Sequence, residues 1–402
     1  MNAIYFNRFF RALVLLATLI GLSANAGTDW SLIFSNAAPK AIPRRASIIF
    51  IQVDGLGYGD LSCYGQTKFQ TPNLDKLAAE GIRFTNYSIA GAASQSHAAL
   101  MLGKNPADLR QRAGADIPLA PDETTVSQIL KNSGYHTGFI GGWNLGDENS
   151  AGAPWKKGFD EFAGYLDPAD AENFYADYIW RLSPDETYDE SYNDPINGHW
   201  RHWNKAGDSH LPGKETIYAN TQGKNQFIPD LITKAALNFI ENNQPDQFNH
   251  YQPFFLLLDY EIPDRKIEVQ TDAPFSEESW PQPEKNKAAL ILCLDGYVGQ
   301  LQEQLQKSGM TNNVVIFLSS GSVPTKTAEI DPEFFHSNIA TNDFRVPMIA
   351  HWPGRIPAGQ VSGYNWSAQD FLPTAAEIAF TKPPGNIDGN SVLPILLGEF
   401  KK

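Results

Sequence analysis

Residues 47–57 read Ser-Ile-Ile-Phe-Ile-Gln-Val-Asp-Gly-Leu-Gly, an almost fully apolar run that ends in an acid and two glycines. Runs of this kind, when glycines bound them, are typical of a strand that is buried on both faces, as in a parallel sheet. The stretch therefore predicts a buried strand over Ser47–Val53 that ends at Asp54.

Strand and helix patterns alternate over the first third of the chain. Thr71–Gly81 has apolar residues at helical spacing and a glycine stop, a helix is predicted from a cap at Asp122 to Gly134, and His136–Trp143 is strand-like. The alternation predicts an α/β fold with a doubly wound, mostly parallel sheet and helices on both faces. The later predicted elements are helices at Asp230–Asn243, Pro283–Gly309 and Ser367–Ala379, and strands at Pro253–Tyr260, Val314–Leu318 and Val346–Trp352.

Residues 167–225 break this rhythm. They are rich in Asp, Asn, Tyr and Trp and show little periodicity, so they predict a long surface excursion over the sheet. The segment contains His199-Trp200-Arg201-His202-Trp203, in which two histidines without a third partner make a weak metal pattern. An aromatic surface loop is the prediction, and Trp200 and Trp203 could stack on a sugar face.

The first 26 residues have the pattern of a secretory signal peptide. Arg8 and Arg11 form a basic region, Ala12–Leu22 is apolar, and Ala24-Asn25-Ala26 is a small-residue cleavage site. The apolar run is short for a bilayer span. The pattern predicts a secreted or periplasmic protein with no membrane attachment after cleavage.

The net charge and the cysteine content exclude a nucleic-acid partner and a disulfide-rich fold. The formal net charge of −14 argues against a nucleic-acid partner, because the phosphate backbone attracts basic surfaces. The two cysteines, Cys63 and Cys293, give no disulfide framework, and Cys293 lies in a helical apolar pattern. Free thiols are therefore expected.

The stretch Ala93–Lys104 reads Ala-Ser-Gln-Ser-His-Ala-Ala-Leu-Met-Leu-Gly-Lys, a polar segment that runs into an apolar helix. Ser94 or Ser96 is expected to cap that helix by accepting a hydrogen bond from a free backbone amide. The exposed amides and the helix dipole favour an anion at such an end. A nucleophile placed here would meet a negatively charged substrate.

Several stretches, taken together and in order, resemble the sulfatase family of the alkaline phosphatase superfamily. They are Asp54–Asp60, Thr71–Thr85, His97–Lys104, Gly142–Gly146, Gly158–Phe162, Arg345–Ile349, His351–Gly359 and Asp388–Pro394. The resemblance implies one sulfatase-like domain over residues 46–398 with a mixed sheet. Family members usually continue into a small C-terminal subdomain, which is expected to be absent here.

The resemblance also implies a specific chemistry. Sulfatases hydrolyse sulfate esters with a formylglycine made from a cysteine or serine. Two adjacent aspartates and a later Asp-Asn pair hold a calcium ion, and Lys and His side chains bind the sulfate. Carboxylate-bound cations and positive side chains are needed because negative charge develops on the sulfate oxygens and on the leaving group.

Most of those residues are missing at the matching positions of this chain. Counted back from Ala98-Ala99-Leu100, the formylglycine position is Ala93, whereas counted forward from Phe84-Thr85-Asn86 it falls on Ser94; the helix is the better anchor, because loop lengths vary before this site. Of the calcium ligands only Asp54 remains, with Gly55, Ser320 and Gly321 at the other positions. The positions of the cationic Lys, His and Arg side chains are taken by Gly142, Asn144, Asp264, His336 and His97. Neither formylglycine nor a bound metal is expected, the alternative being Ca²⁺ at Asp54, and a ligand pocket is predicted from Asp54, Asn144, Asp264 and Ser320.

These observations predict a catalytically inactive pseudosulfatase that binds a glycan, a sulfated small molecule or a protein partner. The alternative is an active sulfate or phosphate ester hydrolase with a reorganised site. In that case Ser94 or Ser96 would be the nucleophile, and His97 or His336 the base.

Overall fold

The computed structural model describes residues 45–89, 93–109, 118–167, 174–182, 212–221, 223–245, 251–263, 267–323 and 344–399. The predicted signal peptide, residues 1–26, lies outside this part of the chain, as do Trp200, Trp203, Asp264 and His336. Among the described residues, no helix is long and apolar enough to cross a membrane.

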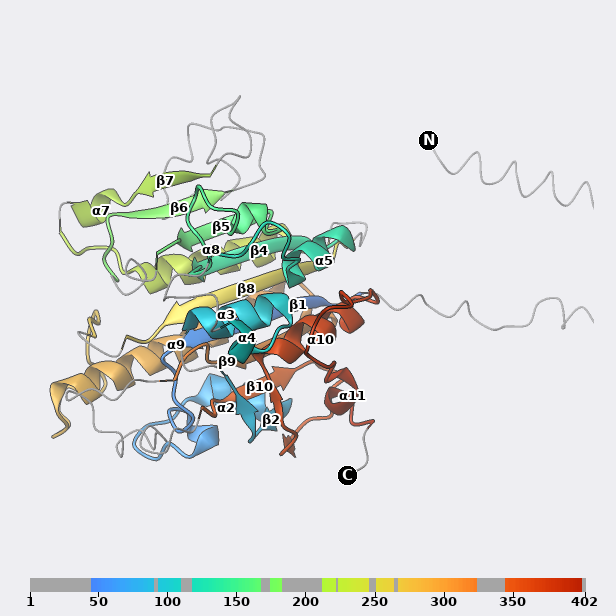
Figure 1. Cartoon of the computed structure of the whole chain (residues 1–402). Coiled ribbons are helices and arrows are strands. Elements are labelled where there is room, and N and C mark those ends of the chain that lie inside the picture. Colours follow the sequence, from blue (N-terminus) through green and yellow to red (C-terminus); the bar gives the residue numbers. More distant parts are fainter. Residues whose placement is uncertain are drawn as a thin grey trace, which may run out of the picture. The chain divides into compact units, whose positions relative to one another are not determined.

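The described residues form a ten-stranded sheet in the order β11-β2-β10-β9-β1-β8-β4-β5-β6-β7 (Figure 1). Strands β9, β1, β8, β4 and β5 are parallel, while β10, β6 and β7 are antiparallel to their neighbours. The predicted mixed, mostly parallel sheet is therefore confirmed. The strands are β1 (Ser47–Asp54), β2 (Ile82–Phe84), β4 (His136–Gly142), β5 (Glu161–Tyr165), β6 (Tyr178–Leu182), β7 (Gly213–Thr216), β8 (Phe254–Glu261), β9 (Val314–Ser319), β10 (Met348–His351) and β11 (Gln360–Ser362).

Helices cover both faces of the sheet. One core cluster joins alternate β1 residues, among them Ile49 and Ile51, to α2 (Pro72–Ala79), α8 (Ile228–Asn242) and α9 (Gln282–Lys307). A second cluster joins Ile48 and Phe50 to the helices of the other face, α3 (Ala93–Leu102), α5 (Val126–Asn132) and α10 (Phe371–Ile378). The period-two alternation of β1 thus supplies both cores, as expected for a strand buried on both faces.

The remaining described elements are short. They are the strands β3 (Tyr87–Ser88) and β12 (Trp366–Ser367), which form a separate parallel pair, the helices α4 (Pro106–Leu109), α7 (Tyr218–Thr221) and α11 (Leu393–Leu396), and several 3₁₀ turns. Cys63 and Cys293 are free thiols, as predicted.

The long helix α9 is stabilised by burial of the apolar residues that its sequence repeats at helical spacing. Its apolar residues at spacings of three and four are buried, as predicted, and they include Leu290, Leu294, Val298, Leu301 and Leu305. Full burial of one such side chain stabilises a fold by about 1.5–3 kcal/mol. This stripe therefore holds α9 firmly on the sheet.

Two predicted helix caps are wrong. Helix α5 begins at Val126 rather than after Asp122, and Thr125 caps it: the Thr125 hydroxyl accepts from the Gln128 amide while the Gln128 side chain accepts from the Thr125 amide. This reciprocal pair satisfies two free amides at once, so it fixes the helix start. Ser94 and Ser96 both lie inside α3, so neither is its cap.

The segment 167–225 also differs from its prediction as an excursion over the sheet. Its described residues include β6 and β7, which extend the sheet beyond β5. Lys214 of β7 lies over two β6 rings, 4.1 Å from the centroid of Tyr178 and 5.3 Å from that of Trp180. Cross-strand contacts of this kind stabilise strands that have little periodicity of their own.

Candidate functional site

Polar side chains gather where β1 and β8 end at the same edge of the sheet. The two strands pair in parallel with Gln52 opposite Asp259 and Asp54 opposite Glu261. The carboxylates of Asp54 and Asp259 are both buried, at 2% and 6% exposure. In open α/β sheets this edge is the usual place for a ligand.

Helix α3 directs a histidine at these two acids. The His97 Nε2 atom lies 3.4 Å from Asp54 Oδ1 and 3.7 Å from Asp259 Oδ2. One ligand atom from each residue can be chosen so that all three lie within 4.8 Å of one another. We call Asp54, His97 and Asp259 the His97 cluster. The sequence analysis did not predict Asp259 as a site residue. An acid within the apolar run 253–260 could have indicated it, because a charged side chain in a buried strand usually has a function.

Burial dominates the electrostatics of the His97 cluster. Burial raises the pKa of the Asp54 carboxyl, and the charge of His97 opposes this only in part. Burial also raises the pKa of Asp259 well above its usual value, and the charges of Asp54 and Glu261 raise it further. Two carboxylates close together in a buried site cannot both stay ionised without a compensating positive charge.

The cluster also holds polar atoms that lack hydrogen bonds. Within the described part of the chain, Asp54 Oδ1, Asp259 Oδ1 and His97 Nε2 are buried and have no hydrogen-bond partner. An unsatisfied buried polar group costs about 1–3 kcal/mol. The three residues therefore form a polar centre whose hydrogen bonds are incomplete.

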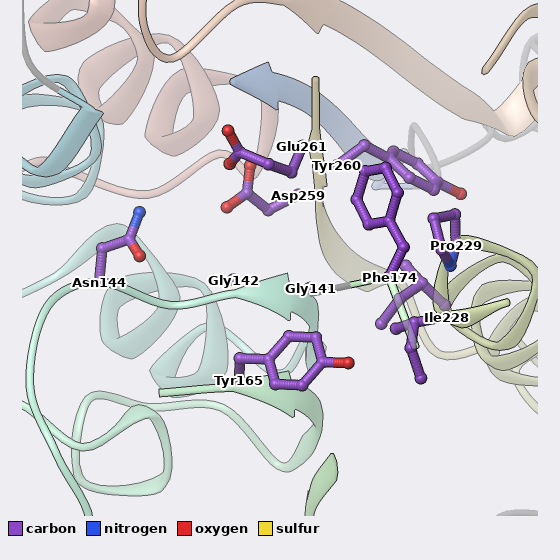
Figure 2. A pocket seen from close by; sticks show the side chains of 11 residues that line it. Gly141, Gly142, Asn144, Tyr165, Phe174, Ile228, Pro229, Asp259, Tyr260 and Glu261 are labelled. Atoms are coloured by element: carbon purple, nitrogen blue, oxygen red, sulfur yellow. The ribbon is translucent and has the colours of Figure 1, made fainter. Parts of the chain in front are cut away.

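Asp259 borders two small cavities. One, of about 30 Å³, is shared with Asn144, Glu261 and Tyr165, and Figure 2 shows both acids directed toward the Asn144 amide. The other, of about 10 Å³, is shared with His97 and Gln52. Cavities of this size hold water or a small ion, whereas pockets for drug-sized ligands reach about 300–1,000 Å³.

Asn144 and Ser320, two of the predicted pocket residues, have different surroundings. Asn144 has a left-handed backbone (φ 59°), and its buried Oδ1 has no hydrogen-bond partner within the described residues. Ser320 Oγ is 2.8 Å from the Val53 carbonyl oxygen and 2.5 Å from that of Ser322. Its hydroxyl therefore ties the end of β9 to the end of β1.

Comparison of the sequence with models of known protein families agrees with the fold described above. The family model described as Sulfatase matches residues 46–380. The chain belongs to the sulfatase family. Among curated sulfatases, it is 29% identical over 400 residues to N-acetylgalactosamine-6-sulfatase of Canis lupus familiaris, covering 93% of this chain and 71% of the relative. It is also 28% identical over 390 residues to human arylsulfatase A, covering 93% and 72%.

Solved structures are similar to this chain as well. The crystal structure of Ps i-CgsB in complex with k-i-k-neocarrahexaose superposes with a TM-score of 0.65 at 26% identity, covering 88% of this chain and 77% of that chain. The PsFucS1 sulfatase from Pseudoalteromonas sp., at 23% identity and a TM-score of 0.60, covers 88% and 72% and shows the same fold.

The resemblance matches Gly55 and Gly321 to calcium-ligand positions of the family, and neither glycine has room for a larger side chain. Gly55 has φ +79°, and a Cβ atom there would lie 2.1 Å from the Ile262 carbonyl oxygen. A Cβ atom at Gly321 would lie 2.1 Å from Asp54 Oδ1 and 2.3 Å from Gln52 Nε2. Calcium needs six to eight oxygen ligands, so the residues present do not fit the family's ion.

The two candidate serine nucleophiles lie on α3 close to His97. Ser94 is half-buried and Ser96 is buried. The Nε2 atom of His97 lies against the carboxylates of Asp54 and Asp259, so Nδ1 is the ring nitrogen that would have to act as a base for either serine. The other proposed base, His336, and the pocket residue Asp264 lie outside the described residues.

Proposed function

We propose that this sulfatase-family member is a pseudosulfatase that binds a glycan and does not hydrolyse sulfate esters. The observation that carries the proposal is the closure of the calcium positions, since the backbone oxygen of Ile262 fills the space at Gly55 and the Asp54 carboxylate fills that at Gly321. With Ala93 at the formylglycine position, the family's nucleophile is lost together with most of its calcium ligands.

The charges around the site support the same conclusion. Among the described residues that line the two cavities, His97 alone can carry a positive charge, while Asp259 and Glu261 are acidic. A sulfate group here would meet like charge at low dielectric constant with little to offset the repulsion. The described residues that line the two cavities therefore supply little of the charge stabilisation that sulfate ester cleavage requires.

A glycan is the ligand class that the relatives suggest. One relative is named for a sulfated N-acetylgalactosamine, and a similar structure was solved with a neocarrahexaose. Hydroxyl groups of a sugar can donate hydrogen bonds to acidic side chains, whereas sulfate can only accept. We therefore expect neutral sugars to be preferred over sulfated ones outside the two small cavities, at the sheet edge where Glu261 is half-buried. The expected location is secreted or periplasmic, with residues 1–26 as the signal peptide.

The hydrolase alternative is tested with purified protein on a panel of aryl sulfates and aryl phosphates, with and without calcium. No turnover above buffer is expected. The matched control is the Ser94→Ala, Ser96→Ala double variant. Turnover that this variant abolishes would establish the alternative, an active ester hydrolase, in place of the pseudosulfatase.

Binding is tested separately by an array of sulfated glycans and their desulfated counterparts. Saturable binding that does not decrease on desulfation is expected. Binding that requires the sulfate groups would contradict the preference argued from Asp259 and Glu261. Binding to a protein partner, with none to any glycan, would replace the glycan proposal by the other predicted class of ligand.

A further inference from the structure

The His97 cluster has the geometry of a small metal centre, which the family's calcium site does not explain. Its donors come from three elements: Asp54 from β1, His97 from α3 and Asp259 from β8. The two measured donor separations are 3.4 Å and 3.7 Å. Two ligands held 2.0–2.2 Å from a tetrahedral zinc ion lie about 3.3–3.6 Å apart.

We propose that Asp54, His97 and Asp259 bind a divalent transition-metal ion of the zinc class. One imidazole nitrogen and two carboxylate oxygens suit such an ion, whereas calcium and magnesium prefer oxygen ligands alone. The site differs from the family's calcium site in two of its ligands, because His97 stands at an arginine position and Asp259 at none of the family's metal positions.

The state of the donor atoms points to a ligand independently of their spacing. Within the described residues, Asp54 Oδ1, Asp259 Oδ1 and His97 Nε2 have no hydrogen-bond partner, and all three residues are more than nine-tenths buried. A dication would neutralise both carboxylates and give His97 Nε2 a partner. Without it, the fold holds two buried acids close together with incomplete hydrogen bonds, an arrangement that is costly.

The surroundings of the cluster limit its coordination. Gly55 and Gly321 exclude further side-chain ligands on the β1 and β9 side. On the other side, Asp259 borders the 30 Å³ cavity, in which there is room for a water molecule near Asn144. Three protein ligands and a water make a four-coordinate centre, the arrangement that zinc adopts at open sites.

A second histidine in the chain provides a matched control. His136 Nδ1 is 3.6 Å from Asp160 Oδ2, and His136 Nε2 is 2.7 Å from Glu161 Oε1. The two acids therefore meet different nitrogens of the ring, and Lys131 neutralises Asp160 at 2.5 Å. A single ion cannot be held by both nitrogens of one imidazole, so this second group should bind no metal.

The test is isothermal titration calorimetry with ZnCl₂ on the purified full chain after treatment with EDTA. One equivalent of zinc is expected to bind, with a rise in the melting temperature and no comparable response to CaCl₂. The nearly isosteric Asp259→Asn variant and His97→Gln should each weaken zinc binding at least 100-fold. His136→Gln should bind zinc like the parent protein.

Spectroscopy keeps the test decisive if a variant folds poorly. Co²⁺ added to the parent protein should give the intense visible absorption of a four-coordinate site, and Zn²⁺ should displace it. The proposal is overturned if no zinc binds, if both cluster variants bind it as the parent does, or if His136→Gln abolishes binding. Its failure is distinguishable from that of the pseudosulfatase proposal, whose tests measure ester turnover and glycan binding and not zinc binding.

Discussion

Two histidines in this chain are each placed between two acids, yet their surroundings differ. His97 directs one nitrogen at Asp54 and Asp259 in a buried site, and the described residues that line its cavity include no lysine or arginine. His136 meets Glu161 and Asp160 through separate nitrogens, and Lys131 is paired with Asp160. We call these three partners and His136 the His136 cluster.

The difference shows that residue types alone do not define a site. The His136 cluster is partly exposed, its Nε2 is hydrogen-bonded to Glu161, and a nearby cation offsets its acids, so it needs no ligand. The His97 cluster is buried, and its donor atoms converge from three elements without mutual hydrogen bonds. The first arrangement stabilises the fold, whereas the second is suited to holding an ion.

The largest expected effect on stability is that of a substitution at Gly55, which follows Asp54 of the His97 cluster in the sequence. Gly55→Ala should lower the free energy of unfolding by about 3 kcal/mol or more, because the new Cβ would overlap the Ile262 carbonyl oxygen. Gly309→Ala is the matched control, since Gly309 also has a left-handed backbone (φ +66°) but no neighbour within 4 Å. Gly309→Ala should lower the free energy of unfolding by only about 1 kcal/mol, because alanine is strained in a left-handed backbone conformation. Urea unfolding measures both variants. If the two variants lose the same free energy of unfolding, the close contact between position 55 and the Ile262 carbonyl oxygen does not limit stability.

The next prediction compares one acid from each cluster. With EDTA present, Asp259→Asn should raise the free energy of unfolding by about 1 kcal/mol, because it replaces a buried carboxyl whose ionisation is opposed by burial and by the charge of Asp54 with a neutral amide of the same shape. Glu161→Gln should lower it by about 1–2 kcal/mol, because Glu161 is hydrogen-bonded to His136 at 2.7 Å. Urea unfolding measures both variants. Changes of the same sign would remove the distinction between the two clusters.

The pH dependence of stability should report the His136 cluster. Burial lowers the pKa of His136, but the hydrogen bond and charge of Glu161 and the charge of Asp160 outweigh it, so the folded-state pKa is raised. The stabilisation is then fully present below the unfolded pKa and is lost as the pH rises through the folded pKa. Between pH 6 and pH 8.5, the parent should lose about 1 kcal/mol more than His136→Gln. Parallel curves for the two proteins would contradict this.

The smallest expected effect comes from the cation of the His136 cluster. Lys131→Ala should change the free energy of unfolding by no more than about 0.5 kcal/mol, because the Lys131 side chain is 46% exposed. It should also raise the pKa of His136 further, because the charge of Lys131 lowers that pKa. NMR titration of the His136 ring measures this shift. A fall in the pKa would show that Lys131 acts through structure and not through charge.

Local patterns were sufficient to predict much of the fold. The apolar run Ser47–Val53 and the three- and four-residue spacing over Pro283–Gly309 gave β1 and α9 close to their observed bounds. The caps were less reliable because several polar residues compete at a helix start. Thr125 and Gln128 did carry the reciprocal capping pattern, which outweighs the single acid Asp122.

The sequence by itself determined the family resemblance, the buried central strand and the glycines at positions 55 and 321, which the resemblance matches to calcium ligands. These follow from residue identity at positions that are close along the chain. Only the tertiary structure decided that Asp259 and His97 meet Asp54, and that β6 and β7 extend the sheet. The physical reason is that strand register and helix placement bring distant side chains together, and no local period encodes either.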